Sequence, residues 1–111
     1  MSFSTSVERR EGAAIVRLEG DLDIASEQQA TAELEHALDG ADVLVADLRG
    51  LAFLDSTGVR VLLSVELVAR ERGARFGVVR GDGMVARLLE MTRIDQRFPV
   101  VDDPDELVAG E

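Results

Sequence analysis

The stretch that decides the fold reads VLVADLRGLAFLDSTGVRVLLSVELVARERG and covers residues 43–73. It opens with four consecutive apolar residues, Val43 to Ala46, which is typical of a parallel strand buried on both faces. Apolar residues 51–54 then approach Asp55, and a helical pattern runs from there to Arg72, before Gly73. We therefore expect a central strand, a loop over residues 48–56 and a long helix. The apolar face of this helix is expected to include Val59, Leu62, Leu63, Val65 and Leu67.

The residues before this stretch predict a hairpin followed by a helix. Residues 13–19 alternate between the two faces of a strand, and residues 2–9 are expected to pair with them as an antiparallel edge strand. Gly20 to Asp23 is expected to be a loop. Ser26 and Gln29 have the spacing of a capping box and predict a helix that stops at Gly40. Its buried side is expected to comprise Ala30, Leu34, Ala37 and Leu38, with His36 facing solvent.

The residues after the stretch predict a second alternation of strand and helix. Residues 76–79 indicate a strand, and residues 81–83 a turn into a helix. The apolar stripe of that helix is Val85, Leu88, Leu89 and Thr92. Residues 98–101 indicate a last strand, placed at an edge because Pro99 lacks an amide donor, and a short helix is expected near 103–109.

Strands that alternate with helices pair in parallel through right-handed crossovers. The sequence therefore predicts an α/β fold with an open, mixed and mostly parallel sheet, helices packed on it and one antiparallel N-terminal edge strand. At 111 residues, the chain is expected to form a single domain over residues 1–111.

The composition excludes several classes of function. There is no cysteine, which excludes disulfides and thiolate chemistry, and all 12 basic residues are arginine, which excludes lysine-based catalysis. The formal net charge is −10, so nucleic acid and anionic membrane surfaces are poor partners. No apolar run approaches the roughly 18 residues of a membrane span, and the N-terminus lacks a basic leader segment, so a cytoplasmic location is expected.

In open α/β sheets the functional crevice lies beyond the carboxyl ends of the parallel strands. The loops over residues 20–25, 48–56 and 80–83 are expected to meet there. This edge is expected to hold Asp21, Asp23, Asp55, Ser56 and Thr57.

Two kinds of chemistry can be weighed at this edge. Carboxylates suit hard cations, so a metal site is one alternative, but acidic residues also form turns and caps. The residues for such a site would be Asp21, Asp23, Asp47 and Asp55. A serine hydrolase is disfavoured, because Ser56 lacks the Gly-x-Ser-x-Gly elbow and the single histidine, His36, faces away. We expect no metal, no cofactor and no enzymatic activity.

Ser56 is the sharpest local feature. Either Asp55 or Ser56 is expected to cap the helix. Glycine in the first helical turn is less stable than alanine by roughly 1 kcal/mol, so Gly58 calls for a reason other than helix formation. Because glycine has no side chain, we expect it to leave bare backbone that another protein can approach. The amino end of a helix is also a favourable seat for a phosphate.

Four segments together resemble one known family. They are the serine motif Asp55-Ser56-Thr57-Gly58-Val59 with Leu62, the turn Gly20-Asp21-Leu22-Asp23, the apolar run 43–46 ending in Asp47-Leu48, and residues 88–92. The sequence resembles the STAS domain proteins that act as bacterial anti-sigma factor antagonists.

The resemblance implies a partner-switching regulator of transcription, for example in a stress response. When unphosphorylated, such a protein binds an anti-sigma factor that is also a serine kinase, and so releases the sigma factor. The kinase inactivates the antagonist by phosphorylating the serine, here Ser56, and a phosphatase restores it. The implied partner-binding residues are Asp21, Asp23, Asp55, Ser56, Thr57, Gly58, Val59 and Arg60. The free protein is expected to be a monomer or weak dimer. The alternatives are a STAS scaffold or sensor that is never phosphorylated and a small ligand-binding domain.

The chain departs from the family pattern at two positions. Many members have glycine where this chain has Arg60, and the loop after the third helix often reads Thr-Gly-Leu where this chain has Thr92-Arg93-Ile94. The first difference bears on kinase recognition, and the second on local packing.

Overall fold

The computed structural model describes residues 2–108. The elements, in chain order, are β1 (Phe3–Arg10), β2 (Ala13–Leu22), α1 (Glu27–Ala37), β3 (Val43–Leu54), α2 (Ser56–Glu71), β4 (Arg75–Val79), α3 (Gly83–Thr92), the 3-10 turn η1 (Ile94–Gln96), β5 (Val100–Val101) and α4 (Asp105–Val108). The predicted order of strands and helices is confirmed.

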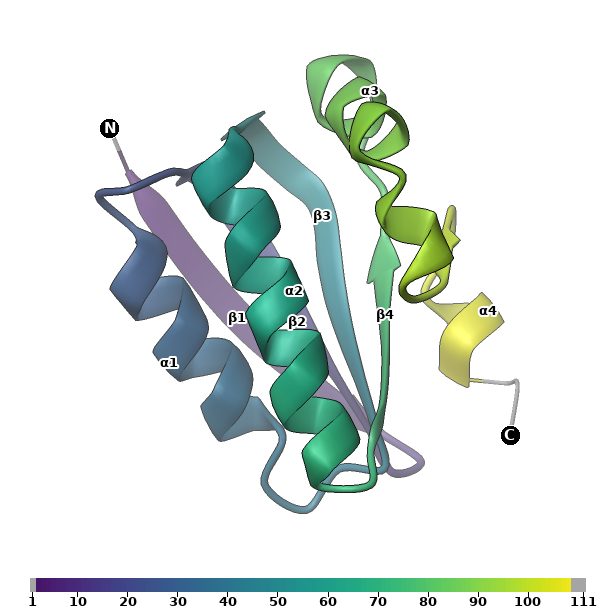
Figure 1. The fold of residues 1–111 in the computed structure, drawn as a ribbon. Coiled ribbons are helices and arrows are strands. Elements are labelled where there is room, and N and C mark those ends of the chain that lie inside the picture. Colours follow the sequence, from purple (N-terminus) through teal and green to yellow (C-terminus); the bar gives the residue numbers. More distant parts are fainter. Residues whose placement is uncertain (1, 109–111) are drawn as a thin grey trace.

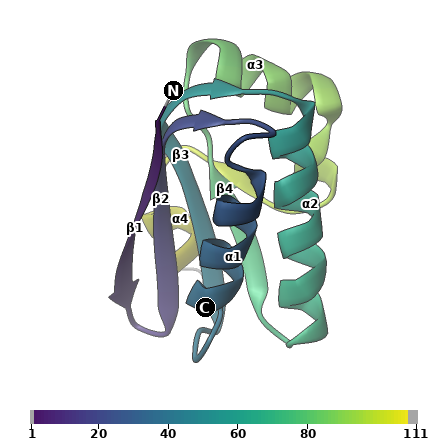
Figure 2. The same ribbon diagram turned by 90° about the vertical axis from the view of Figure 1, so that its left-hand side faces the viewer.

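The five strands form one sheet in the order β1-β2-β3-β4-β5. β1 pairs with β2 in antiparallel orientation, and the remaining neighbours pair in parallel. The predicted mixed sheet with an antiparallel edge strand is therefore confirmed. Figures 1 and 2 show α1 and α2 side by side on one face of this sheet. Because the strands advance in one direction across the sheet, successive right-handed crossovers place both helices on that face.

The central strand β3 is buried on both faces, as its apolar run predicts. Leu44 and Ala46 belong to the larger core with α1 and α2, and both are fully buried. Val43 and Val45 belong to a smaller core on the other face. There the C-terminal residues Leu107 and Val108 supply the cover, so α4 closes the second face of the sheet.

β2 and β3 are longer than the sequence pattern indicates. β2 continues to Leu22 and β3 to Leu54, so much of the predicted loops over 20–25 and 48–56 is paired strand. The pairing continues through two register shifts, between Arg17 and Glu19 and between Gly20 and Asp21. Such shifts bend strands, and Figure 2 shows the ends of both strands turned toward α1 and α2.

The helices form where they are predicted, with three corrections to their caps and buried faces. Ser26 precedes α1 but makes no side-chain cap hydrogen bond, so the predicted capping box is wrong. Leu67 is 47% exposed rather than buried on α2. The predicted buried side of α1 is confirmed, and the side chain of His36 is 85% exposed. On α3, Val85 and Leu89 are buried, whereas Thr92 is exposed.

The C-terminal part of the fold is shorter than predicted. The last strand has only two residues and lies at the edge of the sheet, as Pro99 indicates. α4 covers 105–108 of the predicted 103–109, and residue 109 lies outside the described residues, as do residues 1, 110 and 111 of the predicted domain. Within residues 2–108, no helix combines the length and apolar character that crossing a bilayer requires.

Candidate functional site

Ser56 is the first residue of α2, where the chain leaves the carboxyl end of β3. The cap of the helix is Asp55, whose Oδ1 accepts hydrogen bonds from the amides of Thr57 at 3.0 Å and Gly58 at 3.2 Å. Ser56 is exposed, and its hydroxyl makes no hydrogen bond to any residue of the described range 2–108. Of the two predicted caps, Asp55 therefore does the capping, and the hydroxyl of Ser56 is free for chemistry.

The loop between β2 and α1 lies beside this helix start because β2 and β3 pair in parallel up to their ends. Asp21 is in register with Phe53, and Leu22 with Leu54. The register thus brings together the two sequence segments that carry Asp21, Asp23, Asp55 and Ser56. It confirms that these segments meet at one edge of the sheet.

Ser26 organises the loop instead of capping α1. Its Oγ donates to the carbonyl oxygen of Asp21 at 2.7 Å and accepts from the amide of Asp23 at 3.0 Å. The Oδ1 of Asp23 in turn accepts from the amide of Ala25 at 3.0 Å. This set of local hydrogen bonds holds the acidic loop in one conformation, and the buried Ser26 is occupied by it.

Gly58 faces the core rather than solvent. A Cβ at this position would lie against Cδ1 of Leu54 and 3.0 Å from both Cγ and the carbonyl oxygen of Leu22. The glycine is therefore required for the close approach of α2 to the ends of β2 and β3. The expectation that Gly58 leaves bare backbone open to a partner is corrected. Val59 is likewise buried, at 6% exposure, so both residues position the helix from within.

Asp47 lies at the bend in β3, apart from the helix start, and only 3% of its side chain is exposed. Arg49 donates from Nε to Oδ1 at 3.0 Å and from Nη2 to Oδ2 at 2.8 Å. Burial raises the pKa of Asp47, but hydrogen bonds from the side chain and amide of Arg49, with its charge, bring that pKa below its usual range. Asp47 is thus an ionised structural residue.

The alternative of a cation site is not supported by this arrangement. Within residues 2–108, no three acidic or histidine side chains come together in a way that could hold a metal ion. Of the four carboxylates considered for such a site, those of Asp23, Asp47 and Asp55 accept the hydrogen bonds described above. Asp21 is buried, at 9% exposure.

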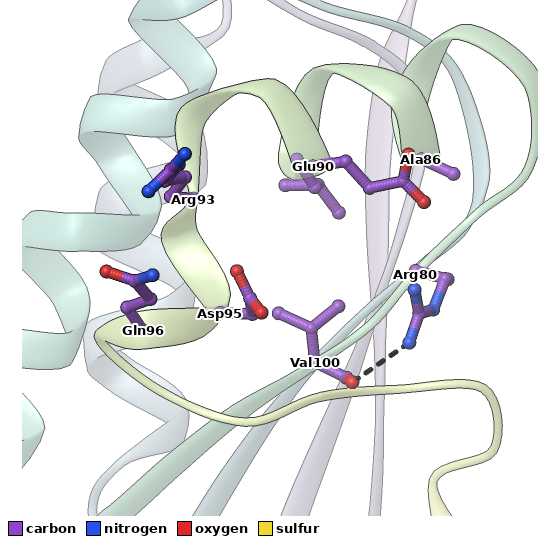
Figure 3. A pocket seen from close by; sticks show the side chains of 8 residues that line it. Arg80, Ala86, Glu90, Arg93, Asp95, Gln96 and Val100 are labelled. Atoms are coloured by element: carbon purple, nitrogen blue, oxygen red, sulfur yellow. Dashed lines mark hydrogen bonds between the residues drawn. The ribbon is translucent and has the colours of Figure 1, made fainter.

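A separate pocket of about 330 Å³ lies between α3, η1 and β5 (Figure 3). Arg80 points into it, but its guanidinium is already engaged. Its Nη2 donates to the carbonyl oxygen of Val100 at 3.1 Å, and its Nε lies 2.9 Å from Oδ1 of Asp102. Arg80 therefore ties β5 to the end of β4. The lining includes none of the residues predicted for the site.

Comparison with known proteins identifies the fold. Residues 4–107 match the family model of the STAS domain. The chain belongs to the STAS domain family. The anti-sigma F factor antagonist of Paenibacillus polymyxa is 28% identical over 105 residues, which cover 93% of this STAS domain chain and 90% of that protein.

Solved structures agree with this assignment. The crystal structure of an anti-sigma factor antagonist from Mycobacterium paratuberculosis has a TM-score of 0.80 and 28% identity, covering 97% of this STAS domain and 92% of that chain. A Thermotoga maritima structure has a TM-score of 0.85 over 95% of this chain and 92% of its own, and at 18% identity it supports the fold alone. The resemblance drawn from the sequence motifs is confirmed.

The structure also reveals apolar side chains that sequence reasoning missed. In this STAS domain Ile24 is 76% exposed, Phe53 37% and Met84 66%. Ile24 lies in the loop after β2, Phe53 near the end of β3, and Met84 in the first turn of α3. All three follow or close a strand at the edge that carries Ser56. The sequence signal for them is an apolar residue placed outside the periodic core pattern.

Proposed function

We propose that this STAS domain is an anti-sigma factor antagonist that works as a phosphorylation-controlled partner switch in the cytoplasm. In its unphosphorylated form it binds an anti-sigma factor with serine kinase activity and so releases the sigma factor. The single observation that supports this proposal best is the exposed, unbonded hydroxyl of Ser56 at the start of α2. The name of the Paenibacillus polymyxa relative supports the same class of partner.

The chain contributes a substrate hydroxyl to this switch and no catalytic group. Oγ of Ser56 takes the γ-phosphoryl group of ATP held by the kinase, the bond to ADP breaks, and the hydroxyl proton leaves to a base on the kinase. A phosphoserine phosphatase reverses the change, because water cleaves the ester and releases inorganic phosphate.

The proposed docking surface consists of the loop after β2, the end of β3 and the start of α2. Exposed Ile24 and Phe53 supply apolar area there, and Ser56 lies within it. A phosphate adds about −1.5 to −2 charges at pH 7. On a chain whose formal net charge is −10, it places a bulky dianion next to Asp55. Repulsion and desolvation of this group therefore disrupt a docked partner directly.

Three hydroxyls close to Ser56 in the chain or at the same edge of the sheet are poorer acceptors for geometric reasons. Ser26 is buried and bonded within its loop, and Thr57 is half-buried. Ser64 is exposed, but its Oγ donates to the carbonyl oxygen of Val61 at 3.3 Å. Peptide mapping after reaction with the cognate kinase and ATP is expected to place the phosphate on Ser56, and a phosphate mainly on another residue contradicts the assignment.

Calorimetry with the anti-sigma factor tests the whole switch. We expect Ser56→Ala to bind the partner like the wild type and to escape inactivation by ATP, and Ser56→Asp to bind at least about tenfold more weakly, a difference of about 1.4 kcal/mol. Ser64→Asp is the matched control, because it adds the same charge two turns further along α2. Equal affinity of the phosphorylated and unphosphorylated forms refutes the switch and favours a STAS scaffold that phosphorylation does not control.

A further inference from the structure

Ser56 and Arg60 lie on the same face of α2. They are four residues apart on one helix, a spacing that leaves about 5–6 Å between Cβ atoms. Both residues are exposed. Side chains on a helix tilt toward its amino end, so the long side chain of Arg60 can reach the turn that begins with Ser56.

Among residues 2–108, the guanidinium of Arg60 has no bonding partner. Ion pairs to carboxylates engage Arg10, Arg17, Arg49, Arg70, Arg72 and Arg80. Arg60 makes neither an ion pair nor a side-chain hydrogen bond with any residue in the described range 2–108. Glu27 and Thr31 of α1, and Arg97 after η1, line a groove of about 430 Å³ together with Arg60 and other residues of α2. Glu27, Thr31 and Arg97 make no side-chain hydrogen bond or ion pair with Arg60. Figure 1 shows α1 and α2 side by side.

The amides that usually receive a phosphate at a helix start are largely taken. Oδ1 of Asp55 already accepts from the amides of Thr57 and Gly58. A phosphoryl group on Ser56 would meet this carboxylate as well as the negative field of the chain. It therefore gains most from a cation on its own face of the helix, and Arg60 is the first arginine after Ser56 in the chain.

We propose that Arg60 binds the phosphoryl group of phosphorylated Ser56 through a charge-assisted ion pair along α2. This inference rests on the proposed phosphorylation of Ser56 and names the residue of this chain that holds the modified side chain. The guanidinium presents paired N–H donors that match phosphate oxygens. The contact offsets repulsion from Asp55 and holds the phosphate over the first turns of α2.

The test uses the full chain with phosphoserine installed at position 56 during translation, so that no kinase is needed. Thermal unfolding is compared for the phosphorylated and unphosphorylated forms of the wild type and of Arg60→Gln. For each variant we take the change in Tm on phosphorylation, that is, the Tm of the phosphorylated form minus that of the unphosphorylated form. We expect this change to be about 2 °C lower in Arg60→Gln than in the wild type, as the loss of one helical ion pair predicts. At 1 M salt this difference is expected to disappear. In the wild type, the Nε–H resonance of Arg60 is expected to shift on phosphorylation.

Arg75→Gln is the matched control. Arg75 is exposed and unpaired within the described part of the chain. It lies at the start of β4, at the amino ends of the parallel strands, whereas α2 begins at their carboxyl ends. The proposal is overturned if phosphorylation changes Tm by the same amount in Arg60→Gln and in the wild type. It is also overturned if Arg75→Gln lowers that change as much as Arg60→Gln does. If the Tm coupling to Arg60 holds while phosphorylation leaves partner affinity unchanged, the proposed function fails and the Arg60 contact stands.

Discussion

At the scale of single residues, the start of α2 divides two tasks between neighbours. Asp55 satisfies the amides of Thr57 and Gly58, whereas Ser56 contributes its side chain to no hydrogen bond within residues 2–108. From the sequence, either residue could have been the cap, because Asp and Ser have similar preferences for that position. Only the backbone geometry, with Asp55 extended and Ser56 helical, decides between them.

Substitution at these two positions separates the tasks. We expect Asp55→Ala to lower the free energy of unfolding by about 0.5–2 kcal/mol, the usual loss of a cap. Ser56→Ala is expected to stay within about 0.5 kcal/mol of the wild type, as exposed substitutions do. Urea unfolding measures both. A larger loss of unfolding free energy for Ser56→Ala than for Asp55→Ala would show that the main role of Ser56 is structural.

Gly58 gives a second prediction at this scale. Gly58→Ala places a methyl group against Leu54 and Leu22, so we expect it to lower the free energy of unfolding by about 1–3 kcal/mol despite the higher helix propensity of alanine. Ser64→Ala, at an exposed position of the same helix, is the control and is expected to change stability little. If Gly58→Ala stabilises the chain in urea unfolding, the close approach described above is absent.

At the scale of secondary-structure elements, the bent ends of β2 and β3 position the site. The polar pair Asp47 and Arg49 lies at this bend, and Arg49 forms a bidentate ion pair with the carboxylate of Asp47. Arg49→Gln leaves a buried carboxylate without its main partner, so we expect a loss of about 1–3 kcal/mol at pH 7.

The pH dependence of that loss has a defined sign. The pKa of Asp47 is lower in the folded chain than in the unfolded chain, so its pairing with Arg49 stabilises the fold above about pH 4, the unfolded value. This stability is lost as the pH falls through the folded pKa. The difference between wild type and Arg49→Gln, followed by urea unfolding from pH 7 to pH 2.5, is therefore expected to shrink below pH 4. A constant difference would contradict the role of the ion pair.

The junction of α3 and η1 gives a further prediction. Arg93 has a φ of 56°, in the left-handed region that favours glycine, and it ends α3 there. This is the position where related sequences were expected to carry glycine, which explains that preference. We expect Arg93→Gly to raise the free energy of unfolding by about 0.5–1 kcal/mol, since left-handed geometry costs other residues about 1–2 kcal/mol. A matched Arg87→Gly variant, inside α3, is expected to be destabilised by a similar amount.

The sequence predicted strands and helices correctly where burial imposed a hydrophobic pattern. It failed where strand pairing or local hydrogen bonds determined the structure. Alternation in residues 13–19 and the run 43–46 identified strands, because both face packed helices. The sequence predicts a loop over residues 48–56, yet parallel pairing with β2 continues as far as Leu54. Ser26 has the spacing of a capping box, but the carbonyl oxygen of Asp21 is a competing acceptor that no one-dimensional pattern reveals.

At the scale of the whole molecule, the site lies on a well-packed support. The larger core joins β2, β3 and β4 to α1, α2 and α3, and Leu22, Leu54 and Leu62 belong to it. Since Ser56 is exposed on this support, we expect phosphorylation to cause no general refolding. In amide NMR spectra of the two forms, shifts are expected to be confined to residues 21–26 and 53–64. Widespread shifts in β1, β4 or α4 would contradict this expectation.

Asp55 caps the helix and Ser56 does not, and this division has a consequence for how such a protein can evolve. A residue without a folding role can be exchanged without loss of stability, so a serine, alanine or aspartate at position 56 is compatible with the same scaffold. Under the proposed function, one substitution converts the phosphorylation-controlled protein into one that is permanently active or permanently inactive. The proposed switch can therefore be gained, lost or fixed by selection, while the residues that build the domain stay unchanged.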